Sequence, residues 1–535
     1  MLRFGVLQGG KIRPCDNART SLHNLATTLF ETVSLESADF PARMAALFVE
    51  LLGDTSHFSV LIGTEDIASA YRRMPCSEPW FTVFAQWDPF SERVVFFRLQ
   101  GFNFGLKSAV VAFNRLSFRM QRAAVRLLPL CSGSYFDDFA CVEPRFAAGG
   151  QALLRRFAAL LRVPFAGASL GDGKSHAPRA CNTFLGVVDD FSMFGRTGEL
   201  FASVPAASVE ETAAVISRVL QQGSFAGTYG ASKLAGKLHF TISWALHRFG
   251  RAALGPLHAA AAASGRHEAV SPLLRDALTF LHELLVDADG KCRLRPRRYR
   301  LRRRRGQLPR PTLVWSDAMW EASATHPAGI GFLVFIPDDE AASPPSEFRG
   351  VSLPRGRWRY LSFTVGSDFM LQLLRRMQYI GQLEILAAVV VYFSLARELR
   401  GRQVIHFIDN SSAMAALVKG YSSAPDSASL VHAFWAMAAY IEVDVWFEYV
   451  RSAANIADWP SRGECGALIT ELRATEIEPT LPPVGSFRDV ERAVLLALGQ
   501  DTGAPYGGSS GSASSLPPFT SSAGASTASR KRRAR

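Results

Sequence analysis

The sequence predicts three folded parts in order: an α+β domain over residues 1–190, a helical segment over 191–295 and an α/β domain over 312–465. The first part alternates short apolar runs, such as 58–62 and 93–97, with turns, as strands do. The second is rich in alanine and leucine, with breaks at Gly223, Gly230 and Gly250. The third orders its runs as strand-strand-strand-helix-strand-helix-helix-strand-helix, which predicts a five-stranded sheet.

The composition is that of a globular protein with a polyanionic partner. The chain has 535 residues, too many for one core, of which 48% are hydrophobic and 20% charged. Its net charge of +12 favours binding to nucleic acid or an acidic membrane surface, although a soluble basic protein without such a partner also fits.

The cysteines and the apolar runs indicate in which cellular compartment the protein is expected. The seven cysteines form no CxxC pair, which argues against a disulfide framework and a structural zinc site. The longest apolar run, 385–396, is too short to span a bilayer, and the N-terminus has no signal segment. We therefore expect an intracellular protein in the cytoplasm, the nucleus or both, with no membrane partner.

Two segments are predicted to lie outside the domains. Residues 296–311 hold an arginine run closed by Pro309 and Pro311, and we expect a basic linker there. The run over 297–305 equally fits a nuclear localisation signal, a nucleic-acid contact or a solvated connection. Residues 466–535 are expected to form a tail, largely disordered at its Gly/Ser/Ala/Pro-rich end.

The first part carries three carboxylates that suit metal-dependent phosphoryl transfer. Asp137 and Asp138 are flanked by aromatic residues, as in a tight β-hairpin, and Asp66 follows the apolar run 58–62. Two-metal catalysis needs acids that converge on two cations about 4 Å apart, and a strand end and a hairpin can supply them. Between them, 104–109 is a glycine turn followed by a lysine and a predicted helix, a pattern suited to nucleotide phosphates.

The order of these motifs resembles that of retroelement reverse transcriptases. Asp66 to Tyr71, residues 104–108 and the Tyr-Phe-Asp-Asp motif at 135–138 are similar to the three central motifs of the family. Residues 171–174 and 184–186 resemble its later palm motif and primer-gripping hairpin, and 10–14 with Asp16 resemble its fingers segment. The resemblance implies an α+β palm and fingers polymerase domain at 1–190 and a helical thumb and connection at 191–295.

The resemblance also implies residue roles. The metal-holding catalytic acids would be Asp66, Asp137 and Asp138, and Tyr71 would exclude a ribose 2′-hydroxyl. The other nucleotide-binding residues would be Lys11 and Arg13 at the triphosphate, Phe104 and Gly105 under the incoming nucleotide, and Lys174 at the pyrophosphate leaving group.

The third part has a second set of acids. Asp317 and Asp409 each follow an apolar strand, Glu384 opens a helix, and Asp458 lies in the last motif. Acids in this order of elements resemble those of the ribonuclease H fold, an α/β domain with a mixed five-stranded sheet. The resemblance implies that all four are catalytic and metal-binding, with two Mg²⁺ ions per site and Mn²⁺ as an alternative.

Two differences from the retroviral ribonuclease H pattern, together with the middle segment of the chain, indicate a subfamily. The motif at 450–455 is short and lacks the histidine of retroviral versions, and about twenty residues, 363–382, separate the third strand from the first helix. Short histidine-free forms are known from DIRS-like retrotransposons and pararetroviruses. Residues 231–240 and 251–257 are similar to the thumb and connection region of DIRS-like elements.

The expected activity is RNA-directed DNA polymerase combined with RNA–DNA hybrid endoribonuclease. Its partners would be an RNA template, a DNA primer, the RNA–DNA hybrid and dNTPs, with other retroelement proteins as further candidates. Only ten residues precede Lys11, where the family usually has a longer fingers region. Two alternatives therefore stay open: a decayed or domesticated copy that binds hybrids without polymerising, and a protein with nuclease activity only.

Overall fold

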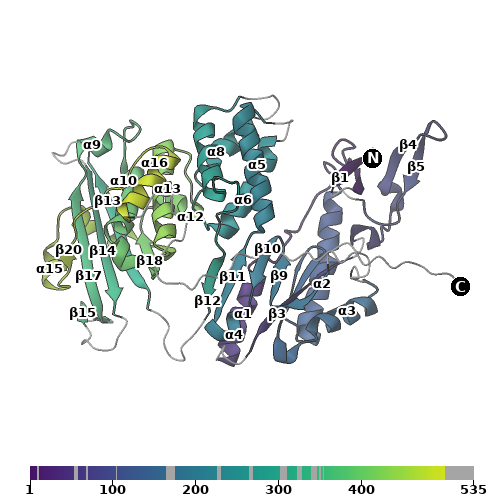
Figure 1. Ribbon diagram of the computed structural model, residues 1–535, viewed down its shortest axis with the longest axis horizontal. Coiled ribbons are helices and arrows are strands. Elements are labelled where there is room, and N and C mark those ends of the chain that lie inside the picture. The colour runs from purple at the N-terminus through teal and green to yellow at the C-terminus, as the bar shows by residue number, and fades with distance from the viewer. Residues whose placement is uncertain are drawn as a thin grey trace.

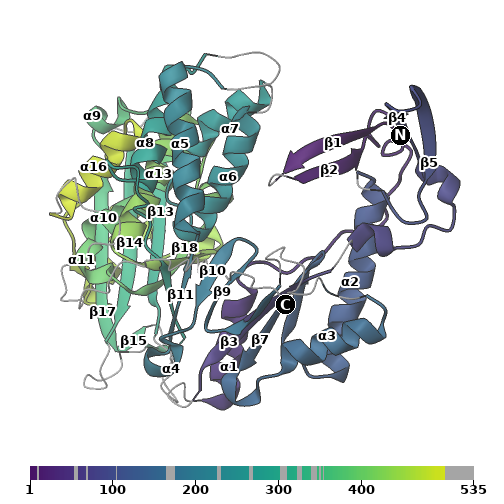
Figure 2. The same ribbon diagram turned by 45° about the vertical axis from the view of Figure 1, so that its right-hand side comes forward.

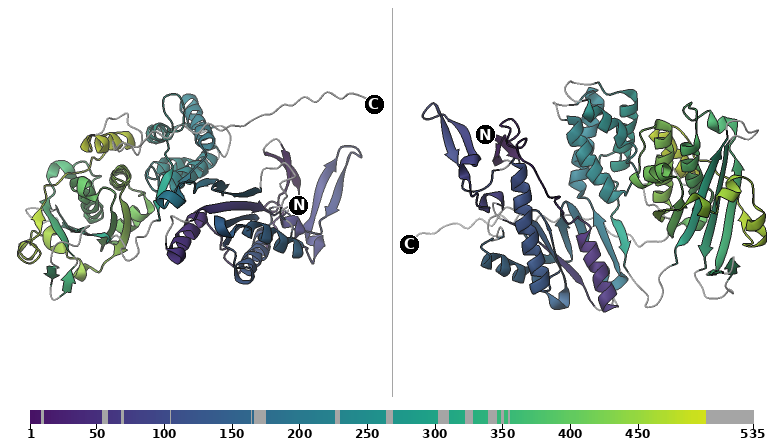
Figure 3. Two further views of the ribbon diagram at one scale, coloured as in Figure 1. Left: turned by 60° about the horizontal axis from the view of Figure 1, so that its bottom comes forward. Right: turned by 180° about the vertical axis from the view of Figure 1, so that it is seen from behind.

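The computed structural model describes residues 1–499 apart from 9–10, 54–57, 68–69, 104, 164, 166–174, 226–229, 264–268, 302–309, 322–327, 339–345, 349–350 and 354. Two hairpins and one small sheet lie toward one end, a layer of helices stands in the middle above a second small sheet, and a larger sheet with its own helices lies at the other end (Figure 1, Figure 3). No helix in the described part of the chain is long and apolar enough to cross a membrane.

The N-terminal part is built on an antiparallel sheet with strand order β6-β7-β3-β8. Val60 and Ile62 of β3 pack with Phe40 of α1, while Phe113 of α2 and Leu154 of α3 belong to a second buried cluster. The bounds are β3 (Val60–Asp66), β6 (Ser132–Tyr135), β7 (Asp138–Pro144), β8 (His176–Arg179), α1 (Phe40–Leu52), α2 (Lys107–Leu127) and α3 (Gly150–Leu160).

Two hairpins stand beyond this sheet, at the far end of α2 (Figure 2). Residues 93–97, predicted as a strand, lie in β5, and the other predicted run, 58–62, leads into β3, so both predictions are confirmed. Arg3 of β1 forms a two-bonded ion pair with the buried Asp16 of β2, at 2.8 and 2.9 Å. The hairpins are β1 (Arg3–Gln8) with β2 (Lys11–Asp16), and β4 (Val83–Asp88) with β5 (Arg93–Arg98).

Part of the segment expected to be a linker forms a strand of a second antiparallel sheet, and residues 302–309 of it lie outside the described residues. The order of this sheet is β12-β11-β10-β9, and β12 is formed by Arg297–Arg300, part of the segment expected to connect the domains. Tyr299 and Leu301 alternate with arginines and pack against the buried cluster of the first part, so one face of this segment is apolar. The other bounds are β9 (Cys181–Phe184), β10 (Val187–Asp190), β11 (Glu199–Ser203) and the short helix α4 (Phe194–Thr197).

Residues 191–295, predicted to be helical, begin with α4 and strand β11 and then form a layer of four helices. Gly223 follows the first of them with φ +67°, a left-handed conformation that glycine adopts without strain. Ser271 begins the last helix, and its side chain accepts a hydrogen bond from the backbone N–H of Leu274. The helices are α5 (Ala206–Gln222), α6 (Gly230–Ala245), α7 (Leu254–Ala262) and α8 (Pro272–Leu285).

The C-terminal part is built on a mixed sheet of six strands rather than five. The order is β19-β18-β13-β14-β17-β20; β13, β14 and β17 are antiparallel, while β18, β19 and β20 each pair in parallel. The sixth strand comes from the segment expected to be a tail. The strands are β13 (Thr312–Trp320), β14 (Ala328–Pro337), β17 (Gly356–Thr364), β18 (Gln403–Ile408), β19 (Asp444–Tyr449) and β20 (Thr475–Glu476), with a separate hairpin of β15 (Ser346–Phe348) and β16 (Val351–Leu353).

One hydrophobic core joins this sheet to the helical layer. Phe249, next to α6, stacks on His432 of α13, and Phe280 of α8 contacts both His432 and Phe487 of α16. Helix α16 also lies in the expected tail, so the packed part of the chain reaches beyond residue 465. The helices are α9 (Ser367–Met370), α10 (Ile380–Ser394), α11 (Ala396–Leu399), α12 (Ser411–Lys419), α13 (Pro425–Tyr440), α14 (Asp458–Ser461), α15 (Gly466–Thr470) and α16 (Phe487–Ala497).

Candidate active sites

The β6–β7 hairpin places Asp137 and Asp138 at one end of the N-terminal sheet. Tyr135 pairs with Asp138, so Phe136 and Asp137 form a two-residue turn, and Phe136 takes φ +53°. Asp138 also lies directly opposite Asp66 across the β3–β7 ladder. The backbone N–H of Ile67 donates to the carbonyl of Asp137 at 2.9 Å. The three predicted acids of this half therefore share one end of the sheet.

Helix α2 holds this hairpin with polar side chains that the sequence analysis missed. The Ser117 hydroxyl donates to the carbonyl of Phe136, and the Gln121 amide donates to the carbonyl of Ser132 at 2.6 Å. The two residues are four apart and lie on the same face of the helix. Ser117 is completely buried, and a serine at helical spacing among apolar residues was the signal that could have identified it.

The side chains of the three acids differ in exposure. Asp66 is buried, Asp137 half-buried and Asp138 exposed. Among the described residues, they do not form a set of three ligand atoms that all lie within 4.8 Å of one another. The backbones of the three acids thus lie at the same end of the sheet, but their carboxylate oxygens do not converge on a common metal-binding position.

Tyr71 lies beside Asp137. It is in the 3-10 turn Ala70–Arg73, and its ring contacts that of Phe113 at 5.1 Å between centroids. Burial raises the pKa of the Tyr71 phenol above its ordinary value, and the negative charge of Asp137 raises it further. The aromatic side chain of Tyr71 therefore lies within electrostatic range of Asp137, one of the predicted metal ligands.

The other predicted nucleotide contacts are only partly described. Lys11 and Arg13 lie on β2, opposite Gln8 and Val6 of β1. Gly105 has φ +104°, and a side chain there would meet the carbonyl of Asp16 at 2.4 Å, so the close approach requires glycine. Phe104 and Lys174 lie outside the described residues.

Asn24, which the sequence analysis did not single out, fixes the turn at Gly105. Its amide donates to the carbonyl of Gly105 at 2.8 Å and accepts from the backbone N–H of Lys107 at 2.9 Å. The side chain therefore joins the turn to the first residue of α2, in the segment predicted to contact the nucleotide.

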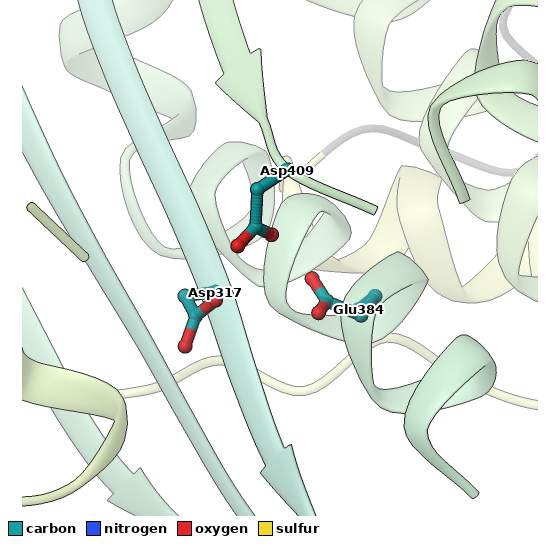
Figure 4. Close-up of side chains that lie close together, drawn as sticks. All are labelled: Asp317, Glu384 and Asp409. Atoms are coloured by element: carbon teal, nitrogen blue, oxygen red, sulfur yellow. The ribbon is translucent and has the colours of Figure 1, made fainter. Parts of the chain in front are cut away.

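In the C-terminal half, Asp317, Glu384 and Asp409 come together (Figure 4). Each offers an oxygen, and the three oxygens all lie within 4.8 Å of one another. Asp409 directly follows β18, and Asp317 lies on β13 two residues past the last β13–β18 pair, Trp315 with Phe407. Strand β13 continues to Trp320 rather than ending at Asp317, because β14 keeps pairing with it. Glu384 enters from the first turns of α10.

Burial and the repulsion of neighbouring carboxylates disfavour the charged forms of Glu384 and Asp317. Burial raises the pKa of Glu384 to about 9, and the charges of Asp317 and Asp409 add to the effect. Burial also raises the pKa of Asp317 to about 6 against a hydrogen bond from Ser461, which lowers it. A cation between the acids would reverse both effects by favouring the charged carboxylates.

Two buried oxygens at this site have no hydrogen-bond partner: Oε2 of Glu384 and Oδ1 of Asp409. A buried oxygen without a partner costs free energy unless something else binds it. Three converging carboxylates form an all-oxygen donor set, which is what Mg²⁺ and Mn²⁺ prefer. The residues present therefore fit a divalent cation.

Asp458, the fourth predicted acid, is not part of this group. It is the first residue of α14, and its Oδ1 accepts from Nε of Arg462 at 2.8 Å, an ion pair one helical turn apart. Its charge still raises the pKa of Asp317. The structure places it close to the acids but pairs it with a cation of its own chain.

Two residues missed from the sequence bond directly to Asp317. The Ser461 hydroxyl lies 2.6 Å from Oδ2 of Asp317, and the Asn455 amide lies 3.3 Å from Oδ1. Both come from the last motif: Ser461 lies 144 positions after Asp317 and Asn455 lies 138 positions after it. No local sequence pattern can indicate a contact between residues so far apart along the chain.

Comparisons with known proteins give a remote similarity in fold. No protein-family model matches the chain, and no curated protein matches its sequence. The chain is similar to the foamy viral protease-reverse transcriptase in a complex with dsDNA, at 13% identity and a TM-score of 0.38, over 84% of this chain and 77% of that one. A dRH form of the same viral protein with ds DNA gives the same values and is covered over 65% of its length.

Proposed function

We propose that the chain is an RNA-directed DNA polymerase with ribonuclease H activity, from a DIRS-like retrotransposon, and that both sites use two divalent cations. One observation supports this most strongly: Asp317, Glu384 and Asp409 converge with two oxygens that lack partners. The polymerase half is supported by the pairing of Asp66 with Asp138 beside the Phe136–Asp137 turn.

The residues of each half would play distinct parts. When bound, a pair of divalent cations would activate the attacking oxygen and stabilise the leaving oxygen. In the nuclease half, Asp317, Glu384 and Asp409 would hold them; in the polymerase half, Asp66, Asp137 and Asp138 would. Ser117 and Gln121 would fix the hairpin that carries two of the polymerase acids.

The nucleic acid and nucleotide would contact the N-terminal half. We assign the RNA template, DNA primer and dNTPs to it, with Lys11, Arg13, Phe104, Gly105 and Lys174 as nucleotide contacts. The net charge of +12 supports a polyanionic partner.

Two assays test the proposal on the full chain. Primer extension on an RNA template with Mg²⁺ should yield DNA, and labelled RNA within an RNA–DNA hybrid should be cleaved. Extension and cleavage together support the proposal. Binding of the hybrid with neither activity would favour the decayed copy instead.

A nuclease without polymerase activity is the second candidate. It is favoured by the finding that, in the described part of the chain, only the C-terminal acids form a three-ligand group. Hybrid cleavage with no primer extension, across Mg²⁺ and Mn²⁺, would support this candidate.

Tyr71→Ala should admit ribonucleotides. The side chain lies next to Asp137 and packs on Phe113, so removing the ring opens space beside a sugar bound at these acids. We expect the ratio of rNTP to dNTP incorporation to rise by at least about tenfold, which corresponds to the relief of a steric penalty of about 1.4 kcal/mol on the ribonucleotide. Single-nucleotide extension measures it, and Tyr71→Phe, which keeps the ring, is the control. An unchanged ratio in Tyr71→Ala would remove Tyr71 from this role.

Asp458→Asn should impair hybrid cleavage less than Asp317→Asn. Asp458 is paired with Arg462 and lies outside the three-acid group, so its loss should act indirectly, with a fall of about 10 to 100-fold. Loss of Asp317 should cost several kcal/mol of transition-state stabilisation, on the order of a thousandfold. Single-turnover cleavage rates at saturating Mg²⁺ compare the two. Equal losses would place Asp458 among the direct ligands.

A further inference from the structure

We propose that Ser461 and Asn455 are positioning residues that orient the Asp317 carboxylate for a divalent cation, and that Gly329 and Gly331 give their segment the room to do so. The proposal rests on the nuclease site proposed above and assigns new roles to four residues around it.

Ser461 and Asn455 each contact a different oxygen of the Asp317 carboxylate. Ser461 Oγ lies 2.6 Å from Asp317 Oδ2 and 2.9 Å from the carbonyl of Asp458. A hydroxyl has one hydrogen, and the shorter, charged acceptor forms the stronger bond, so the hydrogen belongs to Asp317. The Asn455 amide gives one hydrogen to Asp317 Oδ1 at 3.3 Å and the other to the carbonyl of Ser316 at 3.1 Å.

These hydrogen bonds fix the orientation of the Asp317 carboxylate and leave its oxygens able to bind a cation. Each carboxylate oxygen can accept more than one bond, so one hydrogen bond to each leaves room for a cation. The Asn455 side chain is itself held, because its Oδ1 accepts from the backbone N–H of Ala457 at 3.3 Å. Asp317 is thus held on both oxygens by one short segment, 455–461.

The segment can reach Asp317 because β14 carries glycine where it passes. Gly331 lies directly opposite Asp317 in the β13–β14 ladder. A Cβ on Gly331 would lie 2.2 Å from the backbone nitrogen of Ser461, and one on Gly329 would lie 2.4 Å from its carbonyl oxygen. Both obstacles are backbone atoms, so a side chain at either position would push Ser461 away from Asp317.

The rest of the segment is anchored independently of this contact. Ile456 and Trp459 pack against a separate apolar cluster that includes Leu333 and Leu468. A change at Ser461 or Gly331 should therefore shift the contact with Asp317 locally and leave the fold in place.

The test measures cation binding directly, with Mn²⁺ titrated into the full chain and followed by electron paramagnetic resonance. Binding that is lost in Asp409→Asn defines the nuclease site. Ser461→Ala should weaken that binding by about 10 to 100-fold, as expected when a group that orients a metal ligand is lost. Ser452→Ala removes an exposed hydroxyl from the same loop and should leave the affinity unchanged.

The variant Gly331→Ala tests the same contact without changing Ser461. It should weaken Mn²⁺ binding while keeping the Ser461 hydroxyl, and adding it to Ser461→Ala should cost little more, because both changes break the same contact. Raised Mg²⁺ should restore hybrid cleavage in Ser461→Ala, which it would not do for a general defect in folding.

The outcomes separate the two claims. If the unaltered chain binds Mn²⁺ at this site and Ser461→Ala binds it equally well, the positioning role is wrong while the nuclease site stands. Additive losses in the double variant would also overturn it. If the unaltered chain shows no binding that depends on Asp409, the proposed nuclease site itself fails.

Discussion

Asp137→Asn should abolish DNA synthesis on an RNA template while leaving cleavage of RNA in a hybrid within about twofold. The substitution keeps the size of the side chain and the backbone carbonyl that accepts from Ile67, so the turn should keep its shape. It removes one negative charge from the acids at the end of the sheet. Loss of a metal ligand should cost several kcal/mol, or about a thousandfold in rate.

The two activities are expected to separate because the two sets of acids lie on different sheets. Asp66, Asp137 and Asp138 belong to the sheet of β3, β6 and β7, whereas Asp317 and Asp409 lie on or beside β13 and β18 of another sheet. Primer extension and hybrid cleavage are measured on the same preparation. Asp289→Asn, an exposed aspartate beyond α8, is the matched control and should leave both rates unchanged. Equal loss of both activities in folded Asp137→Asn would contradict the division into two sites.

Glu384→Gln should abolish hybrid cleavage and, in metal-free protein, should raise the stability at alkaline pH. The pKa of Glu384 is raised from 4.5 to about 9, chiefly by burial. Between these values the folded protein binds more protons than the unfolded chain, so the free energy of unfolding falls as the pH rises. Glutamine cannot ionise, and this part of the pH dependence should disappear with it.

Thermal unfolding in EDTA between pH 5 and 9 measures this effect. The melting temperature of the unaltered protein should fall more steeply with pH than that of Glu384→Gln. Mg²⁺ should raise the melting temperature of the unaltered protein at pH 8 and have little effect on the variant, because binding to the folded state alone stabilises it. Parallel pH curves for the two proteins would show that Glu384 is charged in the metal-free fold.

The local patterns of the sequence were sufficient for the elements and for most of the acids. The apolar runs gave β3, β5, β13 and β18, and the glycine breaks delimited the helical layer, because periodicity and turn chemistry act over a few residues. The apolar runs before Asp317 and Asp409 also predicted that each acid would stand on or after a strand, and the two strands are parallel neighbours, although β13 continues past Asp317.

Contacts between distant segments were decided only by the tertiary structure. Asp458 was predicted by its motif, yet its pairing with Arg462 leaves it outside the three-acid group. The composition of segment 297–300 predicts a charged linker, but the segment forms a strand that pairs with β11. It does so because Tyr299 packs against a buried cluster formed by residues much earlier in the chain. The sixth strand and α16 likewise gain their stability from packing on a sheet and helices that precede them.

By itself, then, the sequence determined which residues could carry the chemistry and in which order their strands and helices occur. The tertiary structure decided which of those residues lie together, and it raised the pKa values of Glu384 and Asp317. Glu384 has the same side chain in every context, and only its burial beside Asp317 and Asp409 raises its pKa to about 9. Ser461 reaches Asp317 only because Gly331, the residue paired with Asp317 on the neighbouring strand β14, leaves room for the Ser461 backbone. Burial and steric fit arise from the packing of segments remote in sequence, and no local pattern encodes them.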